Sequence, residues 1–179
     1  TTAVFIFTDS LRTTFGSLSE DIESGYDLAV RSEIPFGNRL NAAPIDLDLP
    51  ETLAEVPGVV GVQPRVIEFG IVPNTADGSA ALADRGPNIG VNWEDSAITP
   101  RLYLAQGDIP TSITEFTIDV DTAADDGFVV GKKYNLQTPN GLQELTLVGT
   151  FTFADPEENA LVGAKLVAMD TQSTVALFN

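Results

Sequence analysis

Four aspartates within eight residues form the densest group of possible metal ligands in this sequence. Asp119, Asp121, Asp125 and Asp126 lie in the stretch IDVDTAADDG. Calcium prefers carboxylate and carbonyl oxygens, but its sites also need ligands that converge around a tight glycine turn. The Asp-x-Asp and Asp-Asp-Gly spacing meets that requirement only in part. The alternative role for these residues is the outer face of a strand and the cap of a helix, so we expect no bound metal and name the four as candidate ligands.

A second carboxylate pair, Asp46 and Asp48, lies between Pro44 and Pro50. Two carboxylates can act as the acid and the base of a hydrolase. The surrounding pattern indicates a loop and no pocket, so we expect no catalytic residue here. Loss of a hydrolase activity in an Asp46→Ala, Asp48→Ala double variant would support the catalytic alternative.

Two residue types that carry much of enzyme chemistry are missing. The sequence contains no cysteine and no histidine. It therefore has no thiolate nucleophile, no imidazole base, no Ser-His-Asp triad, no disulfide and no ordinary zinc site. No glycine-rich phosphate loop occurs either. We predict that the chain is not an enzyme and needs no cofactor.

The charge of the chain limits its partners. Its 179 residues include 26 Asp and Glu but only 9 Lys and Arg, which gives a formal net charge of −17. Such a surface repels nucleic acid and anionic lipid headgroups. We therefore expect no nucleic acid partner. The first residue is Thr1 and the single methionine is Met169, so we expect the chain to come from a longer protein.

The elements around the aspartates follow from the apolar pattern. Glu115 to Asp121 alternates apolar and polar residues, which predicts a half-buried strand with the carboxylates on its outer face. Thr122 to Asp126 then predicts a helical turn capped by Asp121 or Thr122. Gly127 is expected to end this turn in the left-handed conformation.

A hairpin is predicted next. Tyr134 to Thr138 and Glu144 to Phe153 both alternate, and Pro139-Asn140-Gly141 between them is typical of a tight turn. Gly149 lies in register with the apolar residues of the second strand but has no side chain, which predicts a bulge or a close backbone approach there. The apolar face of that strand consists of Leu145, Leu147, Phe151 and Phe153.

Further elements are expected on both sides of this region, and Trp93 is expected to pack against the core rather than to form an exposed platform. Apolar spacing and capping residues predict helices over Asp9–Ile22, Glu51–Val56 and Thr171–Phe178, and strands over Tyr26–Ser32, Val59–Val72 and Ala164–Met169.

A series of motifs lies in order along much of the middle of the chain: Gly90-Val91-Asn92-Trp93 with Glu94-Asp95, Leu104-x-x-Gly107-x-x-Pro110, Glu115, Asp121-Thr122-Ala123, Gly127, Val130-Gly131, Thr138-Pro139-x-Gly141 and Glu144 to Gly149. In this order, the motifs resemble the extracytoplasmic core domain of MacB/FtsX-like ABC transporter permeases. Lys132 departs from the acidic residue that usually follows the Val-Gly pair in that family.

The resemblance implies an α+β fold with two subdomains. Residues 1–92 and 156–179 would form a membrane-proximal mixed α/β subdomain from the two chain ends, and residues 93–155 a β-rich insertion. The first and last helices would lead into membrane spans outside the given sequence and act as coupling helices. Their residues of interest are Asp9, Leu11, Phe15, Leu18, Leu177 and Phe178.

The function that the resemblance implies is mechanical. A non-catalytic domain on the extracytoplasmic side of the cell membrane would couple cytoplasmic ATP hydrolysis to export or envelope remodelling. Its partners would be a cytoplasmic ABC ATPase subunit, a second permease copy in a dimer, and an exported lipid, lipoprotein, peptide or drug. The alternative is a secreted carbohydrate- or peptide-binding module; a calcium-dependent version predicts a higher melting temperature with calcium.

Overall fold

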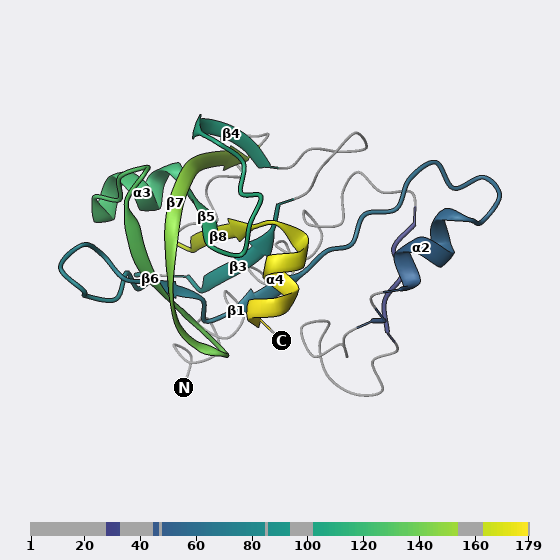
Figure 1. The fold of residues 1–179 in the computed structure, drawn as a ribbon, viewed down its shortest axis with the longest axis horizontal. Coiled ribbons are helices and arrows are strands. Elements are labelled where there is room, and N and C mark those ends of the chain that lie inside the picture. The colour runs from purple at the N-terminus through teal and green to yellow at the C-terminus, as the bar shows by residue number, and fades with distance from the viewer. Residues whose placement is uncertain are drawn as a thin grey trace, which may run out of the picture. The chain divides into compact units, whose positions relative to one another are not determined.

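The computed structural model describes residues 28–32, 45–46, 48–84, 86–93, 102–153 and 163–178. Contacts within the chain divide it into two compact units, residues 1–62 and 63–179 (Figure 1). The predicted helix Asp9–Ile22 lies outside the described residues. Its candidate coupling residues Asp9, Leu11, Phe15 and Leu18 lie there too.

The first unit contains the short helix α2, Leu49–Ala54. Pro50 lies in its first turn, where the missing amide costs no helical hydrogen bond, and Glu51 adds an acidic residue near the positive end. The helix begins and ends two residues earlier than predicted. Residues 28–32 contain no strand, so the strand predicted over Tyr26–Ser32 is wrong in its described part.

The second unit is a strongly curled mixed sheet with helices α3 and α4, which confirms the predicted α+β class. The strand order is β1-β3-β8-β5-β7-β6-β2, with β4 paired to β7. The pairs β3–β8 and β5–β7 are parallel, and the others are antiparallel. The strands are β1 Ile67–Phe69, β2 Val72–Pro73, β3 Asn88–Asn92, β4 Leu102–Gly107, β5 Glu115–Asp119, β6 Lys133–Thr138, β7 Gly141–Phe153 and β8 Lys165–Met169.

Strand β7 is the longest described strand, with 13 residues, and pairs with β6, β5 and β4 (Figure 1). Its register with β5 shifts, so that Phe116 faces Leu147 but Thr117 faces Gly149. A Cβ atom on Gly149 would lie 2.5 Å from the carbonyl oxygen of Asp108 and 2.7 Å from that of Gln106. The predicted bulge and close approach at Gly149 are therefore confirmed.

Helix α3, Val120–Asp126, begins earlier than predicted because Asp119 and not Asp121 is its cap. The side chain of Asp119 accepts a hydrogen bond from the amide of Thr122, which ends β5 and starts the helix. The prediction that Asp119 and Asp121 share a strand face is thus wrong. Gly127 ends the helix at φ 70°, as predicted.

The segment Val59–Val72 does not form the long strand predicted for it. Gly70, at φ 83°, separates the short strands β1 and β2, and residues 59–66 lie outside any strand. The hairpin β6–β7, strand β8 and helix α4, Thr171–Phe178, are confirmed with small shifts in their ends.

Buried apolar side chains of the sheet and of both helices form the core. Tyr134 packs edge to face on Phe128 and Phe116, and its hydroxyl accepts a hydrogen bond from the amide of Val129. Trp93 is buried and packs edge to face on Phe151 with 6.1 Å between ring centres, which confirms its packing role.

The predicted subdomains 1–92 with 156–179 and 93–155 stay a prediction. Strands from both, such as β8 and β5, belong to the same sheet. Within the described part of the chain, no helix is long and apolar enough to cross a membrane.

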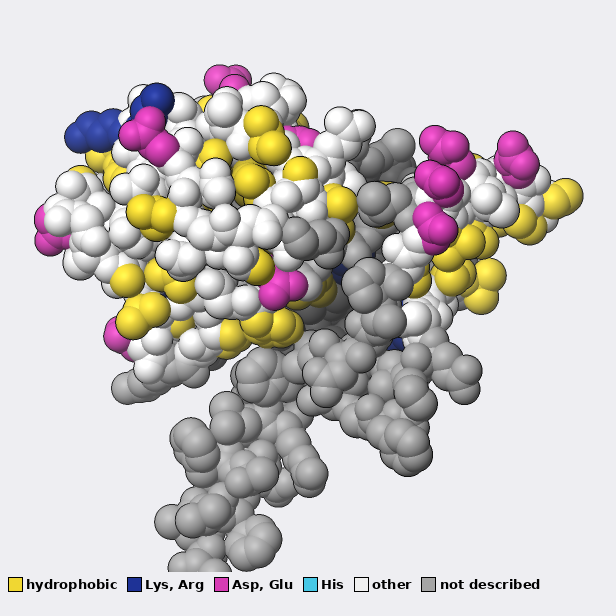
Figure 2. Space-filling view, turned by 60° about the horizontal axis from the view of Figure 1, so that its bottom comes forward, with side chains coloured by type: hydrophobic (Ala, Val, Ile, Leu, Met, Phe, Trp, Pro, Cys, Tyr) yellow, Lys and Arg dark blue, Asp and Glu magenta, His cyan; other side chains and the backbone are white. Residues whose placement is uncertain are grey.

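The face drawn in Figure 2 shows acidic side chains at several places among apolar and neutral ones.

Candidate functional site

The four candidate metal ligands do not come together. Asp119 is buried and Asp126 is half-buried beside Lys165, whereas Asp121 and Asp125 are exposed on α3. Among the described residues, no three Asp or Glu side chains are grouped so that they could hold a metal ion. Asp46 and Asp48 are exposed, and Asp46 accepts a hydrogen bond from the amide of Asp48.

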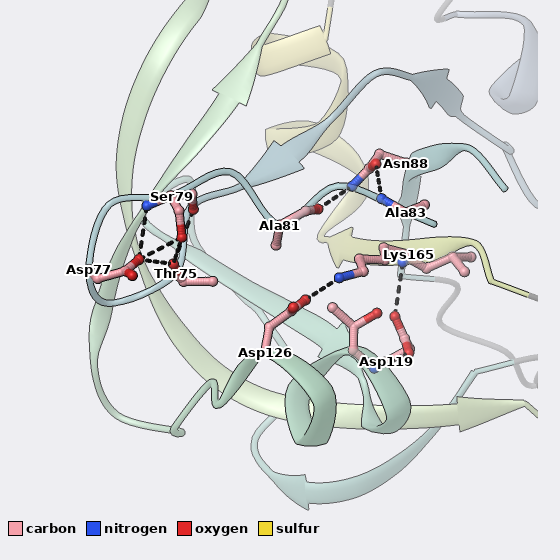
Figure 3. A network of polar contacts seen from close by, with 11 residues as sticks. Thr75, Asp77, Ser79, Ala81, Ala83, Asn88, Asp119, Asp126 and Lys165 are labelled. Atoms are coloured by element: carbon pink, nitrogen blue, oxygen red, sulfur yellow. Dashed lines mark hydrogen bonds and ion pairs between the residues drawn. The ribbon is translucent and has the colours of Figure 1, made fainter. Parts of the chain in front are cut away.

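Two of these carboxylates instead join α3 to β8 (Figure 3). At the start of α3, Asp119 accepts hydrogen bonds from the amides of Thr122 at 2.8 Å and Leu166 at 2.9 Å. At its end, Asp126 forms an ion pair with Lys165. Both ends of the helix are therefore bound to neighbouring residues of one strand, which fixes α3 against the sheet.

We expect the buried carboxyl of Asp119 to lower the stability of the domain as the pH rises above the pKa that this residue has in the unfolded chain. Burial raises the pKa of Asp119 above 3.8, and the amides of Thr122 and Leu166 oppose this only in part. Between the unfolded pKa and the folded pKa of Asp119, the folded chain binds more protons than the unfolded chain. The contribution of Asp119 to the unfolding free energy therefore falls as the pH rises from the first pKa through the second. Urea unfolding of the wild type and of Asp119→Asn at several pH values between about 3.5 and 7 measures it.

The readout is the stability difference between the two proteins, because the neutral asparagine removes this titration while other groups titrate equally in both. The unfolding free energy of the wild type minus that of Asp119→Asn should fall as the pH rises. A difference that grows with pH would mean that the pKa of Asp119 is lowered in the folded chain, and would contradict the expectation.

A second polar cluster in Figure 3 lies in the turn that follows β2. The turn is closed by an isolated antiparallel bridge between Asn74 and Ala80. Asp77 accepts hydrogen bonds from the hydroxyl groups of Ser79 and Thr75 and from the amide of Ser79. These bonds lower the pKa of Asp77 to about 2. The carboxylate thus holds the loop and stays ionised at neutral pH.

A further set of specific contacts surrounds helix α4, which lies against β3 and β8 (Figure 1). Asp170 caps its start by accepting a hydrogen bond from the amide of Ser173 at 3.0 Å, and the Ser173 hydroxyl donates to the same carboxylate. The hydroxyl of Thr174 donates to the carbonyl of Asp170 at 2.8 Å. The helix therefore has a defined beginning directly after β8.

The sequence Gly90-Val91-Asn92-Trp93 positions α4 from both ends. Asn92 is buried, and its amide group donates to Thr171 Oγ1 at 3.0 Å, in the first turn of the helix. Asn92 also binds the segment before β1, because its oxygen accepts from the amide of Val66 at 2.8 Å. At the other end, Gly90 leaves room for Phe178, whose ring atoms lie 2.5 Å from where a Cβ atom of residue 90 would be.

The tip of the β6–β7 hairpin holds the end of α4. Asn140 Nδ2 lies 3.2 Å from the carbonyl oxygen of Ala176 and 3.4 Å from that of Leu177. The last carbonyl groups of a helix have no partner within the helix, so a side-chain donor there stabilises its end. Asn140 is thus both a turn residue and a cap for α4.

Both described candidate coupling residues lie in this arrangement. Leu177 and Phe178 are buried in the core cluster. Sequence reasoning did not find the roles of Gly90, Asn92 and Asn140. Their only signals were the unusual Gly-Val-Asn-Trp sequence and an asparagine in a turn, where it is common for local reasons. We call Gly90, Asn92, Asn140 and their contacts on Thr171–Phe178 the α4 seat.

No protein-family model matches this sequence, and no curated protein matches it either.

Proposed function

We propose that this chain is a non-catalytic extracytoplasmic domain of an ABC transporter permease. It would transmit motion, driven by a cytoplasmic ATPase, to export or to remodelling of the cell envelope. The proposal rests on the order of motifs that resemble MacB/FtsX-like permeases. The observation that supports it best is the α4 seat, because a coupling helix transmits force only where it is fixed to the body that must move.

The geometry of the seat fits such transmission. Asp170 and Asn92 hold the beginning of α4, while Asn140 and the pocket at Gly90 hold its end. A displacement of the helix along or across its axis must therefore move β3, β8 and the β6–β7 hairpin with it. Closely packed interiors deform little, so motion at one end of α4 becomes motion of the sheet.

The association with an ATPase can be tested directly in native membranes. The full-length gene product, tagged and solubilised in detergent, is expected to purify together with an ABC ATPase subunit and with a second permease copy. Mass spectrometry of the purified complex identifies the subunits. Recovery of the product from the extracellular fraction, without any membrane-bound partner, would overturn the proposal.

Motion can be tested in the same complex, because the given sequence has no cysteine. Leu82 is 61% exposed, so a Leu82→Cys variant places one spin label on this domain, once any cysteines outside these 179 residues have been replaced. Electron–electron distance measurements should show different label separations in the ATP-bound and ADP-bound states. Distances that do not depend on the nucleotide would contradict a mechanical role.

We expect Asn140→Ala to weaken this response. Loss of the cap frees the end of α4 and should reduce stability by about 1 kcal/mol, the typical value of one hydrogen bond. The nucleotide-dependent distance change should become smaller or broader. Asn135→Ala is the matched control, since Asn135 lies in the same hairpin with an exposed side chain; an equal effect of both variants would argue against the seat.

A further inference from the structure

Strand β4 and the residues after it form an unusually exposed part of the sheet. All residues from Tyr103 to Ile109 are exposed, and among the described residues β4 pairs only with β7. The exposed fractions of its large apolar side chains are 42% for Tyr103 and 40% for Leu104, with 45% for Ile109 and 49% for Ile113 nearby. We call Tyr103, Leu104, Asp108, Ile109, Ile113 and Glu115 the β4 surface.

A bulge in β4 directs Leu104 and Gln106 to different hollows. Its register with β7 shifts between Leu104 and Gln106, which would otherwise lie on the same side of the strand. Leu104 lines a hollow of about 500 Å³ together with Asp108, Ile109, Thr111, Glu115 and Val148. Gln106 lines a second hollow of about 320 Å³, bounded by Val120, Ala124 and Val130 beside α3. A strand laid along β4 would thus find a recess on either face.

The composition of β4 suggests that this edge is used. Proteins protect free sheet edges with charged side chains, especially lysine, or with proline, because an open edge pairs with other strands. The sequence of β4, LYLAQG, contains no charged residue and no proline. Among the described residues, the bulge is the one protective feature of this edge, and it leaves the apolar residues Tyr103 and Leu104 exposed.

We propose that the β4 surface binds an extended, basic and apolar segment of a partner protein by strand addition. In this mode, backbone hydrogen bonds provide affinity and alternate side chains enter pockets. The charge of the occupant follows from the hollow at Leu104, whose ionisable lining residues are the carboxylates Asp108 and Glu115. The net charge of −17 disfavours a second copy, since two such surfaces would repel each other.

The inference goes beyond the proposed transport function and does not depend on it. Glu115 already accepts hydrogen bonds from the amide and hydroxyl of Thr111, which fixes its carboxylate at the rim of the hollow. Asp108 is exposed there, while its amide bonds to the carbonyl of Val148 and so holds the backbone in place. The charged groups are therefore set before any segment binds.

A synthetic peptide tests the proposal. The probe is a blocked eight-residue peptide in which lysine alternates with valine or isoleucine, titrated against the purified 179-residue chain by fluorescence anisotropy. One control peptide carries N-methyl groups on alternate residues, which removes donors but keeps the charge. The other carries glutamate in place of lysine. We expect binding of the unmodified lysine peptide and at least about tenfold weaker binding of both controls.

Variants locate the site. Asp108→Lys and Leu104→Asn should each weaken binding of the lysine peptide about fivefold or more. Their matched controls are Asp125→Lys, an exposed carboxylate on α3, and Leu142→Asn, an exposed leucine of β7; both should bind like the wild type. Hydrogen exchange should show that the peptide adds protection to β4 amides.

Five results would overturn the proposal. Three concern the peptides and variants: no binding of the lysine peptide, equal binding of the N-methylated or acidic peptide, and equal effects of the site and control variants. The fourth is full protection of the β4 amides from exchange in the free chain, which would mean that the edge is already covered. The fifth is self-association that Leu104→Asn abolishes, which would assign the surface to a second copy instead.

Discussion

Replacement of Phe178 by alanine is expected to lower the unfolding free energy by about 3–5 kcal/mol, the usual cost of removing a buried phenylalanine. The ring belongs to the core cluster and lies in the space that Gly90 leaves open beside Ile71. Its loss would leave a cavity between α4 and β3. Urea unfolding of the purified chain measures the effect, and Gln172→Ala, an exposed change in the same helix, should stay within about 0.5 kcal/mol of the wild type.

A double-mutant cycle with Gly90 makes the test specific. Gly90→Val alone should destabilise the fold by about 1–3 kcal/mol, because its side chain would overlap the ring of Phe178 and Cγ1 of Ile71. In Gly90→Val with Phe178→Ala, the valine occupies part of the vacated space. The combined loss should therefore fall short of the sum by about 0.5–3 kcal/mol. Strict additivity would show that Gly90 does not hold the helix end.

The second large effect is expected at Lys165. The side chains of Lys165 and Asp126 are only 14% and 19% exposed, so removal of either leaves the other charge poorly solvated. Breaking a fully buried pair costs about 3–5 kcal/mol. With the remaining exposure of this pair, we expect Lys165→Met to reduce the unfolding free energy by roughly 2–3 kcal/mol.

Two comparison variants distinguish loss of the Lys165–Asp126 ion pair from a general effect of the changed net charge. Lys133→Met changes the net charge equally but breaks an exposed pair with Glu144, with 65% and 61% exposure, and should cost less than about 1 kcal/mol. Lys165→Met with Asp126→Leu removes both buried charges and should recover most of the stability. A double variant as unstable as Lys165→Met alone would refute the pairing argument.

The local parts of the fold could be predicted because short-range rules determine them. The hairpin follows from alternation around Pro139-Asn140-Gly141, and α3 ends at Gly127 because that position requires a positive φ. The end of β5 was missed by two residues. Asp119 and Asp121 are equally suitable caps by type. In the structure Asp119 caps Thr122 and also accepts a hydrogen bond from Leu166 of β8, a contact between residues far apart in sequence.

The candidate site could be predicted only in part for the same reason. Leu177 and Phe178 were named as coupling residues from the family resemblance, and that role stays a prediction. Their partners Gly90 and Asn140 lie far from them in sequence and are brought close only by the pairing of the strands. The four aspartates, close in sequence, are separated because α3 turns successive residues to different sides. The exposed edge at β4 was not predicted, because the apolar sequence of this strand is typical of a strand that is buried.

The parallel pairing of β3 with β8 determines how this unit can fold. Residues 88–92 pair with residues 165–169, so β3 acquires that neighbour only after more than 70 further residues have been made. The hairpin β6–β7 joins residues close in sequence and can form at once. Closing the long loop between β3 and β8 must therefore come late and slowly. Until then β3 can pair with β1 on one side only, and its other edge stays open to strands of other chains, which favours aggregation.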